Sequence, residues 1–590
     1  MPHRRTQLGP GRIAKGPAPS FPFGIAMRRV FATGYGPSDL RADVLAGTVV
    51  GVVALPLSMA LAIASGVPPQ HGLYTAIVAG IVAALAGGSK VQVTGPTAAF
   101  VVILAPIVEQ HGLGGLLTAG FLAGILLVAM GMARLGRFVE FIPYPVTTGF
   151  TAGIATVIGM LQLKDALGLQ VDRMPEHFLG KLAAFWAARG TASLAEAGVA
   201  AGTFALLLTA PRVVRRIPAP LVALATAAVA VWATGVDVDT VGTRFHATIN
   251  GRDYAGIPPL PPLPGMPWGT GVLGFDLVRS LLPSAFAIAM LGAIESLLSA
   301  VVADGMTGKR HDPDAELVGQ GLANMVAPFF GGIAATGALA RTATNVRAGA
   351  RSPLASVTHA IVVLASVLAL APLVAHLPMA SLAALLALIA WNMLEVRHVE
   401  HMLRVAPRSD VFVLVTCYLL TVVFDMTLAV GVGVVLASFL FMNQMAEITQ
   451  SRVLEAEQNG ETDRVLPPGV ALYEITGALF FGAAKNAMLA LDAIGSNVRI
   501  VVIGLGRVGV IDASGLVALE SALDRLERTR RFVIIAGPLP EPRHVFEKAE
   551  LEVRMDHVLF AENVEQALDI ARDMVALSPE WQHARTDPTA

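Results

Sequence analysis

The chain has 590 residues, of which 54% are hydrophobic and 14% are charged, and its formal net charge at pH 7 is −1. A soluble domain carries roughly 25% charged residues, so this composition excludes an ordinary globular, disordered or collagen-like protein. The balanced charge excludes a basic nucleic-acid binder, and the single cysteine, Cys417, excludes an internal disulfide or a cysteine-based metal cage. What remains is an α-helical polytopic membrane protein with a soluble part.

Residues 1–40 form a basic N-terminal region without the apolar stretch of a signal peptide. Beyond it, apolar runs recur that approach the about 20 residues needed to cross a bilayer as a helix. We expect about fourteen segments in a transmembrane domain, 41–446, built as two inverted repeats of seven: 41–234 and 276–446. Arginine and lysine concentrate in every second connection, which predicts a cytoplasmic N-terminus.

Some apolar stretches are too short, or too rich in Gly and Pro, to cross alone: 72–87, 96–108, 314–328, 336–349 and 378–392. Interrupted segments in matching places of two halves are typical of a transporter's binding site. In the first full-length segment, Pro56 is expected to break the helix in mid-membrane and to leave Ser58 and Met59 lining a cavity. An ordinary proline kink explains Pro56 equally well.

A helix start is predicted at Thr94-Gly95-Pro96-Thr97-Ala98, because Gly95 ends what precedes it and proline suits a first helical turn. The backbone N–H groups at such a start are unpaired and the helix dipole is positive there, so the end favours an anion. The hydroxyl groups of Thr94 and Thr97 add further donors. The alternative is a simple Gly-Pro kink between two packed helices.

Glu295 is the only ionisable residue in the middle of the apolar run 282–303, and Ser299 lies one helical turn further on the same face. A glutamate that can be protonated beside an anion site suggests proton coupling. The alternative is a static salt bridge to Arg341.

The second half contains a matching element, in which Gly331 and Gly332 precede a short helix rich in small residues that includes Ala338, Leu339 and Arg341. Two helix starts that face each other would form one anion site near the bilayer midplane. A buried arginine in a membrane is costly and usually functional, so Arg341 is expected to supply fixed positive charge. The alternative places Arg341 at the cytoplasmic lip, among lipid headgroups.

Hydrophobicity falls after Gln444, and a polar linker, 447–467, is expected before a small α/β domain at 468–575 and a tail at 576–590. Within it, 504–509 fits G-x-G-x-x-G, but the chain continues as a strand, which argues against a dinucleotide site. Asp512-Ala-Ser514-Gly-Leu matches the turn that opens a helix in STAS domains, which the tail resembles. In related regulators the hydroxyl at this position is phosphorylated, so Ser514 is a regulatory candidate. The simpler interpretation is that Ser514 caps the helix.

Several motifs occur in order: Ala54-Leu-Pro-Leu-Ser-Met-Ala, Gly72-Leu-Tyr-Thr75, Thr94-Gly-Pro-Thr-Ala-Ala-Phe and Ala335-Thr-Gly-Ala-Leu-Ala-Arg-Thr-Ala-Thr-Asn345. In these the chain resembles the SulP (SLC26-type) anion transporters with a C-terminal STAS domain. The resemblance implies a core and a gate subdomain, an elevator-like motion, a homodimer and a cytoplasmic tail. It implies a substrate site formed by Pro56, Ser58, Met59, Thr97, Ala98, Ala338, Leu339 and Arg341, with Glu295 and Ser299 beside it as the proton-coupling residues.

The Pro-Leu-Ser-Met-Ala form resembles the DauA-type C4-dicarboxylate branch, which implies proton-coupled uptake of succinate-like anions across a bacterial inner membrane. The bicarbonate branch tends to have a threonine near Leu339 that is tied to sodium, so Leu339 argues against sodium coupling. Bicarbonate or sulfate transport and a passive anion channel are the alternatives. No enzyme activity, metal or organic cofactor is expected, because no nucleophile–base pair or ligand set occurs in the sequence.

Overall fold

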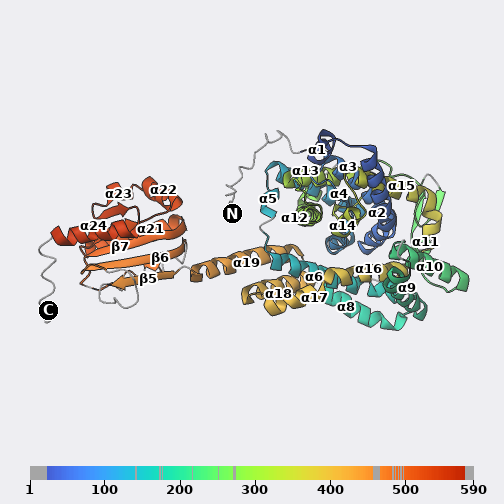
Figure 1. The fold of residues 1–590 in the computed structure, drawn as a ribbon. Coiled ribbons are helices and arrows are strands. Elements are labelled where there is room, and N and C mark those ends of the chain that lie inside the picture. Colours follow the sequence, from blue (N-terminus) through green and yellow to red (C-terminus); the bar gives the residue numbers. More distant parts are fainter. Residues whose placement is uncertain are drawn as a thin grey trace, which may run out of the picture. The chain divides into compact units, whose positions relative to one another are not determined.

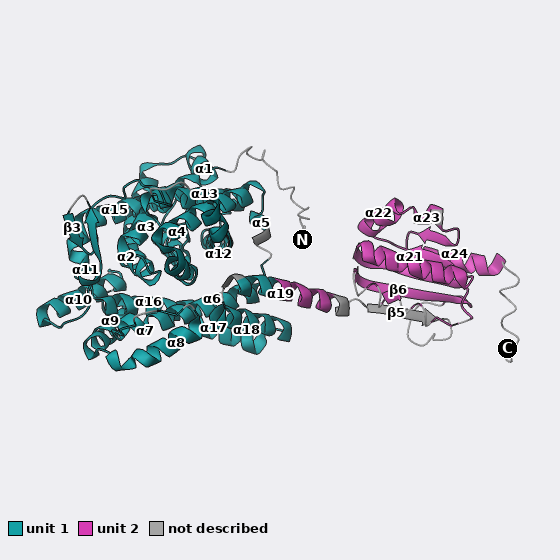
Figure 2. Ribbon diagram, turned by 180° about the vertical axis from the view of Figure 1, so that it is seen from behind, with its two compact units in different colours: residues 1–434 teal, residues 435–590 magenta. Residues whose placement is uncertain are grey.

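The computed structural model describes residues 23–577 apart from short gaps at 140–141, 172–173, 176, 215–216, 250–251, 270–273, 425, 449, 456–465, 481–483, 485–486, 489–490, 492–493 and 496. The chain forms two compact units, residues 1–434 and 435–590 (Figure 2). Each unit is described by itself.

The first unit is almost entirely helical. Its helices are α1 (Ile25–Thr33), α2 (Pro37–Ala64), α3 (Pro69–Ala86), α4 (Ala98–Met132), α5 (Gly136–Val139), α6 (Tyr144–Leu161), α7 (Leu163–Ala166), α8 (Phe178–Ala187), α9 (Leu194–Val213), α10 (Ala219–Thr234), α11 (Val241–Arg244), α12 (Phe275–Thr307), α13 (Pro313–Val326), α14 (Leu339–Arg347), α15 (Leu354–Val374), α16 (Met379–Leu394), α17 (Val396–Val405) and α18 (Arg408–Val423). Helix α19 (Met426–Ile448) follows across the unit boundary.

Within the described residues, nine helices are long and apolar enough to cross a membrane, and α10 is a shorter apolar helix. This supports the prediction of a multi-pass membrane protein but does not confirm the number of fourteen segments. Helix α4 is interrupted at Gly112, whose φ of 66° and ψ of −172° are not helical, so it consists of two helices in succession. Its first part, 98–111, covers most of the short apolar segment 96–108 that the sequence indicates.

The helices of the first unit gather into two groups, which Figure 1 shows as separate layers. One group contains α2, α3, α4, α12, α13, α14 and α15, and the other contains α6, α9, α10, α16 and α18. The first group packs closely because glycines on α2 admit the neighbouring backbone: a Cβ on Gly47 would lie 2.3 Å from the carbonyl oxygen of Ala355 on α15.

The predicted break at Pro56 is wrong, because α2 continues through it from Pro37 to Ala64. A proline removes one backbone hydrogen bond, but helices packed inside a bundle tolerate this loss. Helix α3 lies so close that a Cβ on Gly72 would fall 1.9 Å from the carbonyl oxygen of Ser58. Contacts with α3 and α15 therefore keep the helix continuous.

Two short antiparallel pairs complete the first unit. The strands β2 (His246–Ile249) and β3 (Arg252–Ala255) form a hairpin between the two halves of the chain. The strands β1 (Thr94–Gly95) and β4 (Thr336–Gly337) come from different halves and pair with each other. We call β1 and β4 the crossed strands.

The second unit contains a five-stranded sheet in the order β5-β6-β7-β8-β9. Its strands are β5 (Gln450–Glu455), β6 (Val470–Leu479), β7 (Ile500–Ile511), β8 (Phe532–Ala536) and β9 (Val558–Ala561), and its helices are α21 (Ala513–Arg528), α22 (Pro540–Lys548), α23 (Leu551–Arg554) and α24 (Val564–Leu577). Strand β5 is antiparallel to β6, whereas β6 to β9 are parallel. Alternate side chains of β7 enter two apolar clusters: Ile503 joins Leu523 in one, and Val502 joins Leu568 in the other.

The α/β prediction for this unit is confirmed, including the extended chain through the G-x-G-x-x-G motif, which lies within β7. Three details differ. Strand β5 belongs to the sheet, although 447–467 was predicted to be a linker, and β9 and α24 were not anticipated. Asp512, not Ser514, caps α21, because its Oδ1 accepts the backbone N–H of Gly515 at 2.7 Å. The sequence pattern also predicts a helix near 482–494, but this stretch falls largely outside the described residues.

Candidate functional site

The crossed strands bring two helix starts together from positions more than two hundred residues apart. Thr94 faces Gly337 and Gly95 faces Thr336 in the antiparallel register, and the N–H of Ala338 donates to the carbonyl oxygen of Val93 at 2.9 Å. Helix α4 begins at Ala98 directly after β1, and α14 begins at Leu339 directly after β4. The pairing therefore brings the start of α4, with Thr97 and Ala98, close to the start of α14, with Ala338 and Leu339.

Neither helix start is closed by a side-chain cap. The N-cap residues are Thr97 for α4 and Ala338 for α14, and neither side chain accepts a hydrogen bond from its helix. Helix α4 starts two residues later than predicted, because Thr97 is still extended and serves as the N-cap residue. The first backbone N–H groups of both helices thus remain available, and their partial positive charge favours an anion.

Glu295 of α12 touches one of these helix starts. The hydroxyl of Thr97 donates to Glu295 Oε2 at 2.8 Å, which explains why Thr97 does not cap α4. Glu295 is not ion-paired with Arg341 in this structure, so the static salt bridge is not formed. Ser299, one turn along α12, donates instead to the hydroxyl of Thr342 at 3.2 Å and so fixes α14 against α12.

Arg341 of α14 is only 3% exposed, so the lipid-headgroup interpretation is wrong. Its Nη2 donates to the carbonyl oxygen of Pro96 at 2.8 Å, whereas Nε and Nη1 have no partner among the described residues. Gly95 makes this position possible, because a Cβ there would lie 2.3 Å from Nη1. The guanidinium of Arg341 is therefore held next to Gly95 of β1, with two nitrogen atoms that have no partner among the described residues.

The predicted site residues of α2 are buried, whereas Leu339 at the start of α14 is exposed. Pro56, Ser58 and Met59 are buried, and Met59 packs in an apolar cluster with other residues of the bundle, which gives it a packing role. The hydroxyl of Ser58 is buried without a partner among the described residues. Leu339, in contrast, is 45% exposed at the first position of α14.

The sequence analysis missed a set of polar residues on α13. Glu316, Gln320 and Asn324 are spaced by four residues, so they lie on one face of the helix, and all three are at most 2% exposed. We call them the α13 ladder. The only signal in the sequence was this spacing inside the stretch 314–328, which was interpreted as an apolar segment.

Each member of the α13 ladder holds a piece of irregular backbone or a residue of the crossed strands. Gln320 Nε2 donates to the hydroxyl of Thr94 at 2.7 Å. The side-chain amide of Asn324 donates to the carbonyl oxygen of Ala335 and accepts its N–H, both at 2.8 Å. On α12, the hydroxyl of Ser296 also accepts the N–H of Gly337 at 3.0 Å. Side chains thus fix the backbone on both sides of the crossed strands.

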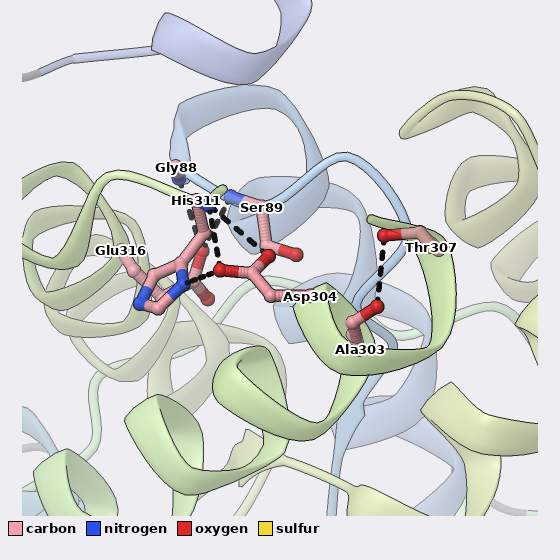
Figure 3. A network of polar contacts seen from close by, with 7 residues as sticks. All are labelled: Gly88, Ser89, Ala303, Asp304, Thr307, His311 and Glu316. Carbon is pink, nitrogen blue, oxygen red and sulfur yellow. Dashed lines mark hydrogen bonds and ion pairs between the residues drawn. The ribbon is translucent and has the colours of Figure 1, made fainter. Parts of the chain in front are cut away.

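The ladder ends at the turn between α12 and α13, which Figure 3 shows from close by. Glu316 Oε2 accepts the N–H groups of Gly88 and Ser89 at 3.0 and 2.9 Å, so it holds the connection that leads into β1. Asp304 closes the turn, because its carboxylate accepts the backbone N–H of His311 and contacts His311 Nδ1 at 2.7 Å.

Two family models match the chain: the sulfate permease family over residues 40–417 and the STAS domain over residues 462–567. The chain belongs to the sulfate permease family. Members of this family are anion transporters in the membrane, not enzymes, and the second unit is the STAS domain. The predicted SulP-type fold with a C-terminal STAS domain is thereby confirmed.

Two curated relatives align over most of the chain. The putative sulfate transporter YvdB of Bacillus subtilis is 41% identical over 523 residues, which cover 88% of this chain and 95% of that protein. The bicarbonate transporter BicA of Picosynechococcus is 30% identical over 543 residues, which cover 88% of this chain and 92% of that protein. Relatives with names for two different anions do not by themselves define the substrate of this chain.

Solved structures agree on the fold. The transmembrane domain of a cyanobacterial BicA is 28% identical, covers 68% of this chain and 98% of its own, and superposes with a TM-score of 0.57. The murine Slc26a9 anion transporter, solved in the inward-facing state, covers 93% of this chain and 94% of its own with a TM-score of 0.80 at 18% identity. The latter likeness concerns the fold alone.

Proposed function

We propose that this chain is a secondary active transporter that takes up a small anion together with a proton, through an elevator-type movement of the helices that carry the crossed strands. The observation that carries the proposal is the hydrogen bond from Thr97 to Glu295 at the start of α4. Two uncapped helix starts and a buried Arg341 attract an anion to this place, whereas a carboxylate of Glu295 competes with it. Protonation of Glu295 removes the competing charge, so proton and anion favour each other's binding.

A C4-dicarboxylate such as succinate is the proposed substrate. The motif around Pro56, Ser58 and Met59 supports this branch, and Leu339 offers an exposed apolar side chain to the methylene carbons of such a ligand. Sulfate or bicarbonate is the second candidate, supported by the names of the relatives. A proton is the proposed coupling ion in preference to sodium.

Uptake of labelled succinate, sulfate and bicarbonate into proteoliposomes tests the proposal. An inward proton gradient should accelerate uptake by the unchanged protein but not by Glu295→Gln, because glutamine keeps an acceptor for Thr97 yet cannot carry a proton. Glu400→Gln is the matched control, since it makes the same change at an exposed position of α17 outside the site, and it should keep the response to the gradient.

Each failure has a separate meaning. If Glu295→Gln still responds to the gradient, this glutamate does not couple transport to protons. If Glu295→Gln leaves a full conductance with no dependence on a gradient, the protein is a passive channel. If succinate does not compete with labelled sulfate or bicarbonate, the dicarboxylate assignment is wrong.

The remaining proposals concern surroundings and regulation. The positive charges of alternate connections support a cytoplasmic N-terminus and STAS domain in a bacterial inner membrane, and the homodimer stays a prediction. Ser514 is exposed at the second position of α21 and does not cap it, so its hydroxyl is accessible to a regulatory phosphorylation.

A further inference from the structure

A second cavity lies in the first unit, away from the crossed strands. It has a volume of about 290 Å³ and is enclosed by the C-terminal end of α2, the first part of α4, the segment α6 to α8, and α16. Its lining includes Ile63, Ala105, Leu382 and several charged side chains. This volume is at the small end of the about 300 to 1,000 Å³ typical of ligand sites, so it suits a small molecule and not a lipid.

The cavity shares two helices with the candidate site. On α4 its lining residues Ala105 and Glu109 follow Ala98, which corresponds to roughly 10 to 16 Å along the helix at about 1.5 Å per residue. On α2 its lining begins with Ala60, directly after Met59. An anion that moves along these two helices from the end of α2 would therefore pass this cavity before it reaches the crossed strands.

Lys181 of α8 is the unusual member of the lining. The residue is only 6% exposed, and within the described residues its side chain takes part in no hydrogen bond or ion pair, whereas its backbone N–H donates to His177. Phe178 and Phe185 lie on the same face of α8, three residues before and four residues after it, and both pack in an apolar cluster with Met160. Lys181 thus lines the cavity on a helix face whose other members are apolar.

The other charges of the cavity do not compensate Lys181. Asp165 is paired with Arg244 at 2.6 Å, and Glu109 is already engaged in an interaction of its own. Lys164 also lines the cavity and adds positive charge. An ammonium group that lines a cavity without a partner loses part of its hydration, which costs free energy that a bound anion would recover.

We propose that this cavity is a second anion subsite, in which Lys181 holds a small carboxylate or oxyanion on its way to the crossed strands. The identity of this ligand as the transported anion rests on the proposed function. The subsite raises the local concentration of substrate and is not involved in its translocation. Loss of Lys181 should therefore change the KM of transport and not its maximal rate.

The first test measures uptake of labelled sulfate and labelled succinate into proteoliposomes. For the anion that is transported, Lys181→Gln should raise KM on the order of fivefold with a maximal rate within about twofold, and Lys181→Arg should restore KM. Arg189→Gln is the matched control, because it removes a positive charge from the neighbouring segment at an exposed position outside the cavity lining. An unchanged KM in Lys181→Gln, or an equal rise in Arg189→Gln, would overturn the proposal.

The second test does not depend on transport. Ala64 lines the cavity and is half-buried, and the native Cys417 is fully buried, so Ala64→Cys introduces the reactive thiol. The measured quantity is the rate of modification by an anionic sulfonate methanethiosulfonate divided by the rate for a cationic trimethylammonium reagent. This ratio should be higher when Lys181 is present than in Lys181→Gln, and sulfate should slow the anionic reaction. An equal rate ratio in both backgrounds overturns the subsite even if transport is established. A ratio that depends on Lys181, in a protein that transports none of the three anions, supports the subsite and contradicts the proposed function instead.

Discussion

The crossed strands of the first unit and the sheet of the second unit hold extended chain in opposite ways. Each crossed strand has two residues and is held by side chains of the neighbouring helices. Gln320 donates to the hydroxyl of Thr94, Ser296 accepts the N–H of Gly337, and Asn324 binds the backbone of Ala335 just before β4. The five-stranded sheet is fixed by its own backbone ladder and by apolar clusters on both faces.

The two regions differ in the polar groups that they leave without a hydrogen-bond partner. Within the sheet, neighbouring strands pair through their own backbones, and apolar side chains pack on both faces. The crossed strands instead end in two uncapped helices beside Arg341, whose Nε and Nη1 have no partner among the described residues. Polar side chains of the neighbouring helices must then hold the crossed strands, because backbone pairing of only four residues is too weak to hold them.

The largest effect is expected when Arg341, beside the crossed strands, is replaced by an apolar residue of similar length. Arg341→Met should lower uptake on the order of 100-fold, since it removes charged N–H donors beside the helix starts. The same change should leave thermal stability in detergent unchanged or higher, because an uncompensated buried charge is lost. Uptake and thermal unfolding of the same preparation check this, and a folded variant with normal uptake would contradict a role of Arg341 at the site.

A paired comparison tests the two modes of holding the chain. Leu523→Ala in the sheet domain should destabilise that unit by about 2 to 5 kcal/mol, because Leu523 is fully buried in an apolar cluster. It should leave uptake per folded molecule within about twofold. Asn324→Ala should cost less, about 1 to 2 kcal/mol as for interhelical hydrogen bonds in membranes, yet it should impair uptake strongly because it frees the backbone of Ala335.

Hydrogen exchange on the full-length protein separates the two units in this experiment. Increased exchange should be confined to the sheet domain in Leu523→Ala and to residues near the crossed strands in Asn324→Ala. If Asn324→Ala transports normally, the α13 ladder stabilises the fold but does not shape the site.

The smallest effect concerns the helix cap in the second unit. Asp512→Ala should destabilise the start of α21 by about 1 kcal/mol, because it removes the acceptor for Gly515. Ser514→Ala should change stability by less than about 0.5 kcal/mol, as is usual for an exposed position. Exchange of the first amides of α21 measures both, and a larger loss in Ser514→Ala would return the capping role to that serine.

Part of the candidate site could be predicted from the sequence, because its signals are local. Gly95-Pro96 indicated a helix start, and Glu295 and Arg341 were conspicuous as charges in apolar runs. Pro56 gave the wrong prediction, since a local rule about proline does not include the packing of α3 and α15 that keeps α2 continuous.

The partners of these residues could not be predicted in the same way. Glu316, Gln320 and Asn324 share a helix face in the sequence, but nothing in their spacing says that this face meets residues 88–95 and Ala335. The cavity position of Lys181 could not be predicted either, because a lysine between two phenylalanines on a short helix is typical of an interfacial surface.

The sequence by itself determined the apolar spans, the alternation of strands and helices in the STAS domain, and, to within a few residues, that one helix begins near Gly95-Pro96 and another follows Gly331-Gly332. These follow from composition, from hydrophobic periodicity and from the backbone limits of glycine and proline, all of which act within a few residues. The tertiary structure alone decided that the two helix starts pair through the crossed strands, that Arg341 lies behind them, and that Lys181 faces a cavity without a partner. The reason is that hydrogen bonds and charge burial depend on which distant segment comes into contact, and packing of the whole bundle sets that choice.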